Sequence, residues 1–398
     1  MRLIALLLAL AGCTVADGQT TSAPPPVAGA VAGTSTQSVK QDAENPLPFT
    51  ARAVADFTNP WAMAWLPDGK SALVTEQQGT LKLWSEGGIR TVGGVPTVDY
   101  GGQGGLGDVV LAPDFATTRD VYLSYIEAGA GDTRGAVVDR ATLTDQGGAL
   151  SLTNIRRIWE QTPKVTGRGH YSHRIAFSPD GKYLWITSGE RQKGEPAQDL
   201  SNNLGSTLRL FPDGSVPPDN PFAERGGTTA QVWSYGHRNL LGIAYDKDGV
   251  LWTSEMGPKG GDEINREERG ANYGWPVVSN GGDYDSTPLP RHPTRPEFKP
   301  PVTWWTPVIS PAGLIFVRGD RYPGWQGDAL LPGLSSKALI RVAFDGGSDG
   351  KARGREVARY PLFGNRVRAV SQRPDGTVWV LEDQKGSSPG RLIELIPR

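Results

Sequence analysis

The sequence predicts an all-β protein built as one six-bladed β-propeller. A strand–turn–strand unit recurs six times along the chain, glycine (52) and proline (32) are abundant among the 398 residues, and only 37% of residues are apolar. This composition is typical of many short strands joined by tight turns and excludes a helical bundle.

Each copy of the unit is an apolar strand, a turn resembling Pro-Asp-Gly, and a second apolar strand. Asp and Gly tolerate the dihedral angles that such hairpin turns require. Six copies over roughly 350 residues give about 58 residues each, which is the size of a four-stranded blade with long loops. A pair of β-sandwiches would not explain a single recurring unit. The copies are Trp61–Thr75, Gly107–Tyr125, His173–Thr187, Leu241–Glu255, Ala312–Gly333 (stretched) and Arg368–Asp383.

The charge balance excludes some partners. Lys plus Arg (41) nearly equal Asp plus Glu (42), so the formal net charge is −1. No overall field attracts nucleic acid or an acidic membrane surface, and we expect no nucleic-acid partner.

The amino terminus resembles a bacterial lipoprotein signal. An apolar run follows Arg2 and ends in Leu-Ala-Gly-Cys at Cys13, the single cysteine of the chain. The run is too short to cross a bilayer, which needs about 20 residues. We expect a signal at 1–13 with a lipid anchor at Cys13, a disordered tether at 14–48 and the propeller at 49–398. An ordinary signal peptide with an incidental cysteine is the alternative. The expected location is the cell envelope, as an outer-membrane lipoprotein facing the periplasm.

The third unit is flanked by a histidine and a carboxylate. His170 precedes its first strand and Glu190 follows its second strand, so both lie at the same end of an antiparallel hairpin. A carboxylate there can orient the imidazole, which can take a proton from a hydroxyl. The alternative is a structural histidine, and the residues alone leave both interpretations open.

Two arginines open the sixth unit. Arg366 and Arg368 are two residues apart on a strand, so their side chains share one face. Two guanidinium groups on one face suit a ligand with several carboxylates. The alternative is a solvated strand edge.

The fourth unit has oxygen donors at the same end. Arg238–Asn239 precede its first strand, Gly257–Pro258 follow its second strand, and Asp262 and Glu263 come shortly afterwards. Turn carbonyls and carboxylates are suitable ligands for calcium. An ordinary polar loop is the alternative.

Together these loops resemble the soluble PQQ-dependent aldose sugar dehydrogenases, relatives of soluble quinoprotein glucose dehydrogenase. The resemblance extends from Asn59 to Ile396, with the motifs in the same order. The motifs are NPWAMAWLPDG, GQGGLGDVVLAPDF, the His170 segment, AQDLSNNLGSTLRLFPDGSVPPDNPF, YGHRNLLGIAYD, EMGPKGGDEIN, ANYGWP and NRVRAVSQRPDG.

The resemblance implies oxidation of an aldose at its anomeric carbon to a lactone, with hydride passing to the quinone carbon of PQQ. It assigns His170 as the general base, with Glu190 as its carboxylate partner. Arg238 would stabilise negative charge on the quinone oxygen. Gln103 would face the sugar.

The resemblance also assigns the cofactor and metal ligands. PQQ would be held by Asn239, Arg366 and Arg368, with Lys337 as the nearest candidate for a cofactor-binding lysine. The carbonyls of Gly257 and Pro258 would bind the calcium that sits on PQQ. Glu263 and Tyr273 match positions that hold a second, structural calcium. An aldose and an electron acceptor of the envelope are the implied partners.

The sequence departs from the family pattern at several positions. The family reads His-x-Gly-Gly-Arg, but Ser172 and His173 replace the two glycines here. Glu190 stands where aspartate is usual, and the spacing of Lys337 to Arg341 differs. Two other functions stay open: a calcium-dependent propeller lactonase, and a non-enzymatic propeller that presents a binding surface.

Overall fold

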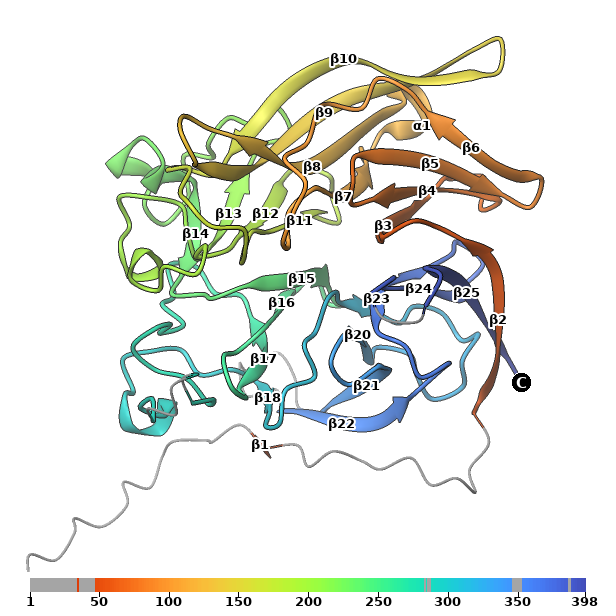
Figure 1. Ribbon diagram of the computed structural model, residues 1–398. Helices are drawn as coiled ribbons and strands as arrows, with labels where there is room; N and C mark the ends of the chain where they lie inside the picture. The colour runs from red at the N-terminus through yellow and green to blue at the C-terminus, as the bar shows by residue number, and fades with distance from the viewer. Residues whose placement is uncertain (1–33, 36–46, 283, 285–287, 346–352, 386–387) are drawn as a thin grey trace, which may run out of the picture. The chain divides into compact units, whose positions relative to one another are not determined.

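Short strands separated by tight turns pair with their neighbours along the chain, so the sheets are antiparallel meanders. The computed structural model describes residues 34–35, 47–282, 284, 288–345, 353–385 and 388–398, and these residues form six small sheets. The innermost strands of consecutive sheets contact one another, and β23 contacts β3, which closes a ring (Figure 1). The predicted six-bladed β-propeller is confirmed.

The first three blades each consist of four consecutive strands. They are β3 (Pro60–Trp65), β4 (Ser71–Glu76), β5 (Thr80–Ser85) and β6 (Gly88–Val92); β7 (Leu106–Leu111), β8 (Asp120–Ala128), β9 (Arg134–Gln146) and β10 (Ala149–Glu160); and β11 (Ser172–Phe177), β12 (Leu184–Ser188), β13 (Ser206–Leu210) and β14 (Val232–Tyr235).

The fourth and fifth blades follow the same plan, with the short β1 (Thr34–Ser35) added parallel to β18. Their strands are β15 (Leu240–Tyr245), β16 (Leu251–Glu255), β17 (Asp262–Arg266) and β18 (Thr303–Trp305); and β19 (Ile315–Phe316), β20 (Ala329–Gly333), β21 (Ala338–Asp345) and β22 (Arg353–Tyr360).

The sixth blade joins the two ends of the propeller. Its inner strands are β23 (Val367–Gln372), β24 (Val378–Glu382) and β25 (Arg391–Pro397), and its outer strand is β2 (Phe49–Asp56). The pairing of β2 with β25 places Phe49 opposite Pro397 and Asp56 opposite Arg391 (Figure 1). The first strand of the propeller therefore closes the last blade.

Helices are few and short. They are α1 (Phe115–Thr118) and the 3-10 turns η1 (Glu195–Gln198), η2 (Ala223–Arg225), η3 (Thr229–Gln231) and η4 (His292–Thr294). Within the described part of the chain, no helix has the length and apolar content needed to span a bilayer. The predicted signal at 1–13 and nearly all of the tether at 14–48 lie outside the described residues.

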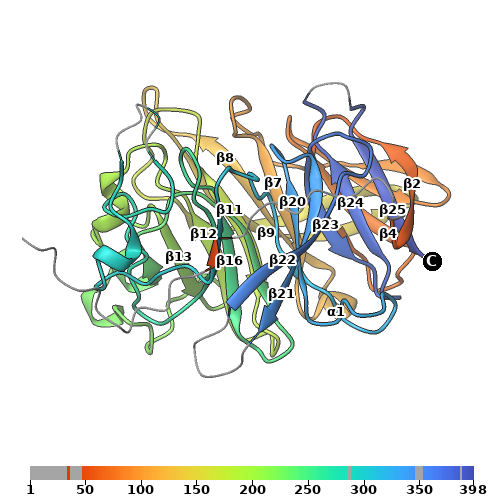
Figure 2. The same cartoon turned by 90° about the horizontal axis from the view of Figure 1, so that it is seen from below.

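The six sequence repeats correspond to the two innermost strands of the six blades. Figure 2 shows the strands running between two faces that consist of loops. Because the strands of each blade alternate in direction, the loop before its first strand and the loop after its second strand lie at the same face. Residues far apart in the sequence are therefore brought together at that face.

A buried arginine fills the centre of the ring. The Arg174 guanidinium, on β11, donates to the carboxylate of Asp108 on β7 (3.1 Å) and to the carbonyls of Leu241 on β15 (2.9 Å) and Ala312 before β19 (2.5 Å). It also lies 3.9 Å from the ring centre of Trp61 on β3. One side chain thus connects five of the six blades.

Candidate active site

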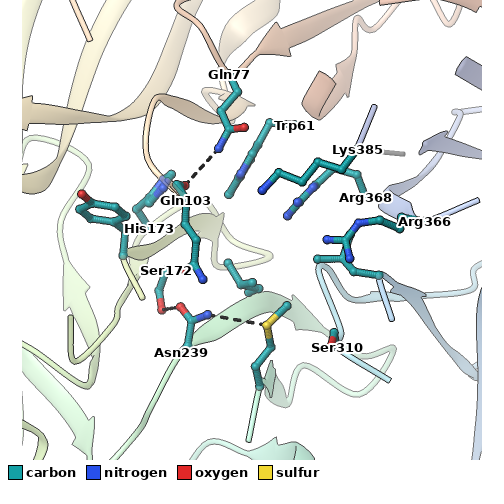
Figure 3. Close-up of a pocket in the computed structure, with 14 residues that line it drawn as sticks. Trp61, Gln77, Gln103, Ser172, His173, Asn239, Ser310, Arg366, Arg368 and Lys385 are labelled. Atoms are coloured by element: carbon teal, nitrogen blue, oxygen red, sulfur yellow. Dashed lines mark hydrogen bonds between the residues drawn. The ribbon is translucent and has the colours of Figure 1, made fainter. Parts of the chain in front are cut away.

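A cavity of about 160 Å³ opens among the loops at one face (Figure 3). Its residues come from the starts of the innermost strands, from the loops before them and from the turns after the second strands. They are Trp61, Gln77, Gln103, Tyr171, Ser172, His173, Asn239, Leu241, Met256, Ser310, Leu334, Arg366, Arg368 and Lys385.

One side of the cavity is cationic. Arg366, Arg368 and Lys385 lie together there, and we call these three residues the cationic wall (Figure 3). Among the described residues that line the cavity there is no Asp or Glu. The wall therefore favours an anionic ligand, and guanidinium groups bind carboxylates in a geometry that matches their paired N–H donors.

Lys337 does not lie where the sequence analysis expected it. It is exposed in the turn between β20 and β21, with a φ of 53°, and does not line the cavity. The lysine that does line the cavity is Lys385, from the loop after β24. From this turn Leu334, which directly follows β20, lines the cavity, whereas Lys337 comes three residues later, directly before β21.

The structure brings His170 and Glu190 into direct contact. Nδ1 of the buried His170 imidazole hydrogen-bonds Oε1 of Glu190, as the hairpin geometry predicted. The other carboxylate oxygen accepts the main-chain N–H groups of Lys193 (2.5 Å) and Gly194 (2.6 Å). These bonds fix the carboxylate, so the imidazole ring is held by one nitrogen and its Nε2 stays available for a proton.

Burial and two neighbouring charged residues, Arg238 and Glu190, determine the pKa of His170. Burial, supported by the positive charge of Arg238, lowers the pKa of His170 below its ordinary value, although Glu190 acts in the opposite direction. Burial alone would raise the pKa of Glu190, but the hydrogen bond from His170 brings it below the usual value. At neutral pH the pair is a neutral imidazole beside a carboxylate.

A polar side of the cavity lies opposite the cationic wall. Oε1 of Gln103 accepts the main-chain N–H of His170 (2.8 Å), so Gln103 connects the histidine to the cavity. Oδ1 of Asn239 accepts the hydroxyl of Ser172 (3.2 Å) (Figure 3). His170 itself is not among the lining residues. It lies just behind Gln103 and Tyr171, which are.

Ser172 and His173 keep the backbone that glycine would adopt. Their φ angles are 59° and 61°, in the left-handed region, where a side chain costs on the order of 1 kcal/mol. The His173 ring stacks on Trp61 at 4.9 Å, and its Nδ1 hydrogen-bonds Ser124 (2.8 Å). A Cβ on Gly107 would lie 2.0 Å from the ring, so the absence of a side chain there makes room for it. These contacts offset the strain, and the imidazole becomes part of the cavity wall.

We expect His173 to make the protein sensitive to acid. Burial lowers the pKa of His173 from 6.5 to about 3. Between these values the unfolded chain binds a proton that the folded chain does not, so stability falls with decreasing pH by about 1.4 kcal/mol per unit. His173→Phe, which keeps an aromatic ring but cannot titrate, should remove this part of the pH dependence. The free energy of unfolding, measured by chemical denaturation from pH 7 to pH 4, checks it; parallel curves for both proteins would contradict it.

Arg238 is buried beside the predicted calcium ligands. Its Nη1 donates to the carbonyls of Met256 (3.0 Å) and Gly257 (2.8 Å), and its Nη2 donates to the hydroxyl of Tyr284 (3.2 Å). Its Nε is buried and has no hydrogen-bond partner among the described residues. A buried donor with no partner is unusual in a folded protein and is consistent with a ligand atom at this position.

Glu263 lies in a small buried cluster of oxygen atoms. Glu255, Glu263 and Tyr273 line the same narrow space of about 10 Å³. Burial, together with the charge of Glu255, raises the pKa of Glu263 well above its usual value. Nδ2 of the neighbouring Asn265 donates to Glu255 (2.8 Å) and to Glu263 (3.5 Å). A cation in this space would neutralise the two carboxylates.

Comparisons with known proteins agree with this geometry. A family model described as Glucose / Sorbosone dehydrogenase matches residues 57–394. The chain belongs to the glucose/sorbosone dehydrogenase family. The aldose sugar dehydrogenase YliI of Escherichia coli (strain K12) is 38% identical over 351 residues, which cover 85% of this chain and 90% of that protein. Family membership confirms the resemblance and identifies the chain as an oxidoreductase.

Two solved structures of aldose sugar dehydrogenases are similar to this propeller. The apo form from Escherichia coli has a TM-score of 0.79 and 36% identity, covering 88% of this chain and 99% of that chain. The PQQ-bound form from Streptomyces coelicolor has a TM-score of 0.70 and 28% identity, again covering 88% and 99%.

Several cavity residues of this glucose/sorbosone dehydrogenase were not selected from the sequence. They are Trp61, Tyr171, Leu241 and Ser310, and four residues that follow the second strand of a repeat: Gln77, Met256, Leu334 and Lys385. The second group had a partial signal, because Glu190 and Gly257 also come shortly after the second strand of their repeats, two residues beyond its end. The offset varies, since Gln77, Met256 and Leu334 come one residue after that strand and Lys385 comes three residues after it.

Proposed function

We propose that this protein oxidises aldose sugars at the anomeric carbon to lactones, with bound PQQ and calcium. The observation that carries the proposal is the cationic wall facing a polar side beside the His170–Glu190 pair. PQQ is a planar quinone with carboxylates, which the wall suits. The PQQ-bound relative from Streptomyces coelicolor supports this choice of cofactor.

His170 is the base in this proposal. Nδ1 is engaged by Glu190, so Nε2 of the neutral ring accepts the proton of the anomeric hydroxyl. PQQ, when bound, supplies the two-electron acceptor for the hydride lost by the anomeric carbon. Glu190 then stabilises the imidazolium that forms. Gln103 and Asn239 donate and accept hydrogen bonds that orient the sugar and the cofactor.

The residues that would hold PQQ fit an anionic quinone. Arg366 and Arg368 would bind its carboxylates, and Asn239 lies across the cavity from them. The unpartnered Nε of the buried Arg238 suits an oxygen that becomes negative during the reaction. The nearby calcium would be held by the carbonyls of Gly257 and Pro258. Because the Gly257 carbonyl accepts from Arg238, the arginine must share or release it when the cation binds.

We propose the second, structural calcium at Glu263 and Tyr273, with Glu255 beside them. Calcium at 100 times its dissociation constant should then stabilise the protein by about 2.7 kcal/mol. Measured without PQQ, so that the calcium that sits on PQQ does not contribute, the calcium-dependent rise in melting temperature should be abolished in Glu263→Gln. Glu268→Gln is the control, because its partly exposed carboxylate pairs with Lys299. An unchanged rise in Glu263→Gln would contradict the site.

The family match favours this function over the lactonase alternative. A lactonase of this kind relies on acidic and Asn ligands clustered around the metal, and it would make little use of Arg366 and Arg368. A binding platform would have no use for a buried imidazole–carboxylate pair beside a cationic cavity. Sugar-dependent dye reduction that requires both PQQ and calcium tests the proposed activity.

We also propose that Cys13 carries a lipid that anchors the enzyme to the bacterial envelope, where it passes electrons to an envelope acceptor. Cys13→Ser should move the protein from the membrane fraction into the soluble fraction. Cell fractionation followed by immunoblotting checks it, and a variant that stays with the membranes would contradict the anchor.

A further inference from the structure

One buried carboxylate contacts all three residues of the cationic wall. Asp383 follows β24 and is 5% exposed. Its Oδ2 accepts from Arg366 Nε and Nη2 (3.2 Å each) and from Arg368 Nη2 (2.7 Å). Its Oδ1 accepts the main-chain N–H of Lys385 (2.9 Å). Asp383 does not itself line the cavity, so it lies behind the wall.

The two guanidinium groups depend on this one carboxylate. Within the described part of the chain, neither Arg366 nor Arg368 forms an ion pair with any other carboxylate. A guanidinium has five N–H donors, and the bonds to Asp383 use only some of them. No nitrogen of Arg366 or Arg368 is both buried and without a partner. The nitrogens that do not bond Asp383 are therefore accessible to a ligand.

Without Asp383 the wall would lose its geometry. Two adjacent guanidinium groups repel each other, and Arg368 is held at 11% exposure, where an unpaired charge is poorly solvated. Burial lowers the pKa of Arg368, and the nearby carboxylate opposes that effect. The shared oxygen therefore sets the spacing of the two groups, and the bond to Lys385 fixes the start of the loop that carries the third cation.

We propose that Asp383 is a positioning residue that preorganises Arg366, Arg368 and Lys385 as a receptor for rigid aromatic polycarboxylates. This inference deepens the proposed function, because PQQ belongs to that ligand class. Preorganised donors bind more tightly because less freedom is lost on association.

The sign of the change in anion affinity distinguishes a positioning role of Asp383 from a purely electrostatic one. Asp383→Asn keeps the shape of the side chain and removes a negative charge behind a site for anions. Electrostatic attraction alone would then tighten anion binding. Loss of the fixed geometry instead weakens anion binding. We expect a loss on the order of 10-fold, as is typical when a residue that orients the direct ligands of a metal site is replaced.

The experiment is calorimetric titration of the purified protein with PQQ, for the wild type, Asp383→Asn and the control Asp120→Asn. Asp120 is also a buried aspartate paired with an arginine, Arg140, but neither residue lines the cavity. We expect Asp383→Asn to raise the dissociation constant about 10-fold or more, with turnover at saturating PQQ nearly unchanged. Asp120→Asn should leave the dissociation constant unchanged. Equal or tighter binding by Asp383→Asn overturns the inference.

Two further measurements keep the test decisive. If Asp383→Asn does not fold, Asp383→Glu keeps the charge but moves it by one methylene, and wild-type affinity in that variant overturns the inference. Benzene-1,3,5-tricarboxylate is the second probe. If the wild type binds it but not PQQ, the proposed function fails, while weaker binding of this probe by the variant still supports positioning. A wild type that binds neither probe contradicts both proposals.

Discussion

Replacing His170 with alanine should lower sugar oxidation by about 10²- to 10⁴-fold, the range over which a general base contributes. His170 hydrogen-bonds Glu190 and lies behind the cavity lining, so the cationic wall stays intact in the variant. The affinity for PQQ should change little. Steady-state turnover at saturating PQQ, measured beside a calorimetric titration with PQQ, separates the two effects.

The pH dependence gives an independent check on His170. The base acts when it is unprotonated, and burial lowers the pKa of His170 below 6.5. Turnover of the wild type should therefore stay constant as the pH falls through 6.5 and decrease only below that value. A His170→Ala enzyme with full activity, or a wild-type profile that falls above pH 6.5, would remove His170 as the base.

Replacing Arg174 with methionine should destabilise the fold by about 3–5 kcal/mol. The substitution leaves the Asp108 carboxylate, which is 6% exposed, without its cationic partner. It also removes the donors to two carbonyls on other blades. Burial already raises the pKa of Asp108 against the effect of Arg174, and in the variant the main-chain N–H groups of Ile175 (3.0 Å) and Val109 (3.1 Å) would be left to stabilise the buried charge. The free energy of unfolding from chemical denaturation measures the loss.

Two variants control this prediction. Arg52→Met breaks an ion pair with Glu394 in which the arginine side chain is 61% exposed, and it should cost less than about 1 kcal/mol. Adding Asp108→Asn to Arg174→Met should recover part of the loss, since the amide is no longer a buried charge. A loss below 1 kcal/mol for Arg174→Met alone would show that the centre of the ring is not held by this pair.

The fold was predictable because local signals and architecture agree. The Asp-Gly turns identify the hairpins, and each hairpin is the inner pair of strands of one blade. The closure of the ring was harder to predict from the sequence. Nothing in the segment 49–56 indicates that it pairs with 391–397 at the other end of the chain, because strand pairing over that separation depends on the assembled propeller.

The site was predictable where a residue has a fixed place relative to a repeat. His170 with Glu190, and Arg366 with Arg368, lie together as their positions indicated. Lys385 was missed because it comes from a loop without a turn motif, and Lys337 was selected on residue type although its spacing differed. The fit of His173 against Trp61, Gly107 and Ser124 depends on three strands from two other blades, so no local pattern shows it.

Reconstitution tests the central claim most directly. The purified protein is freed of metal with a chelator, titrated with PQQ in the presence and absence of calcium, and assayed for dye reduction with a panel of aldoses. We predict sugar-dependent reduction only when both PQQ and calcium are present. A protein that binds no PQQ, or that reduces the dye equally without PQQ or without calcium, would contradict the account.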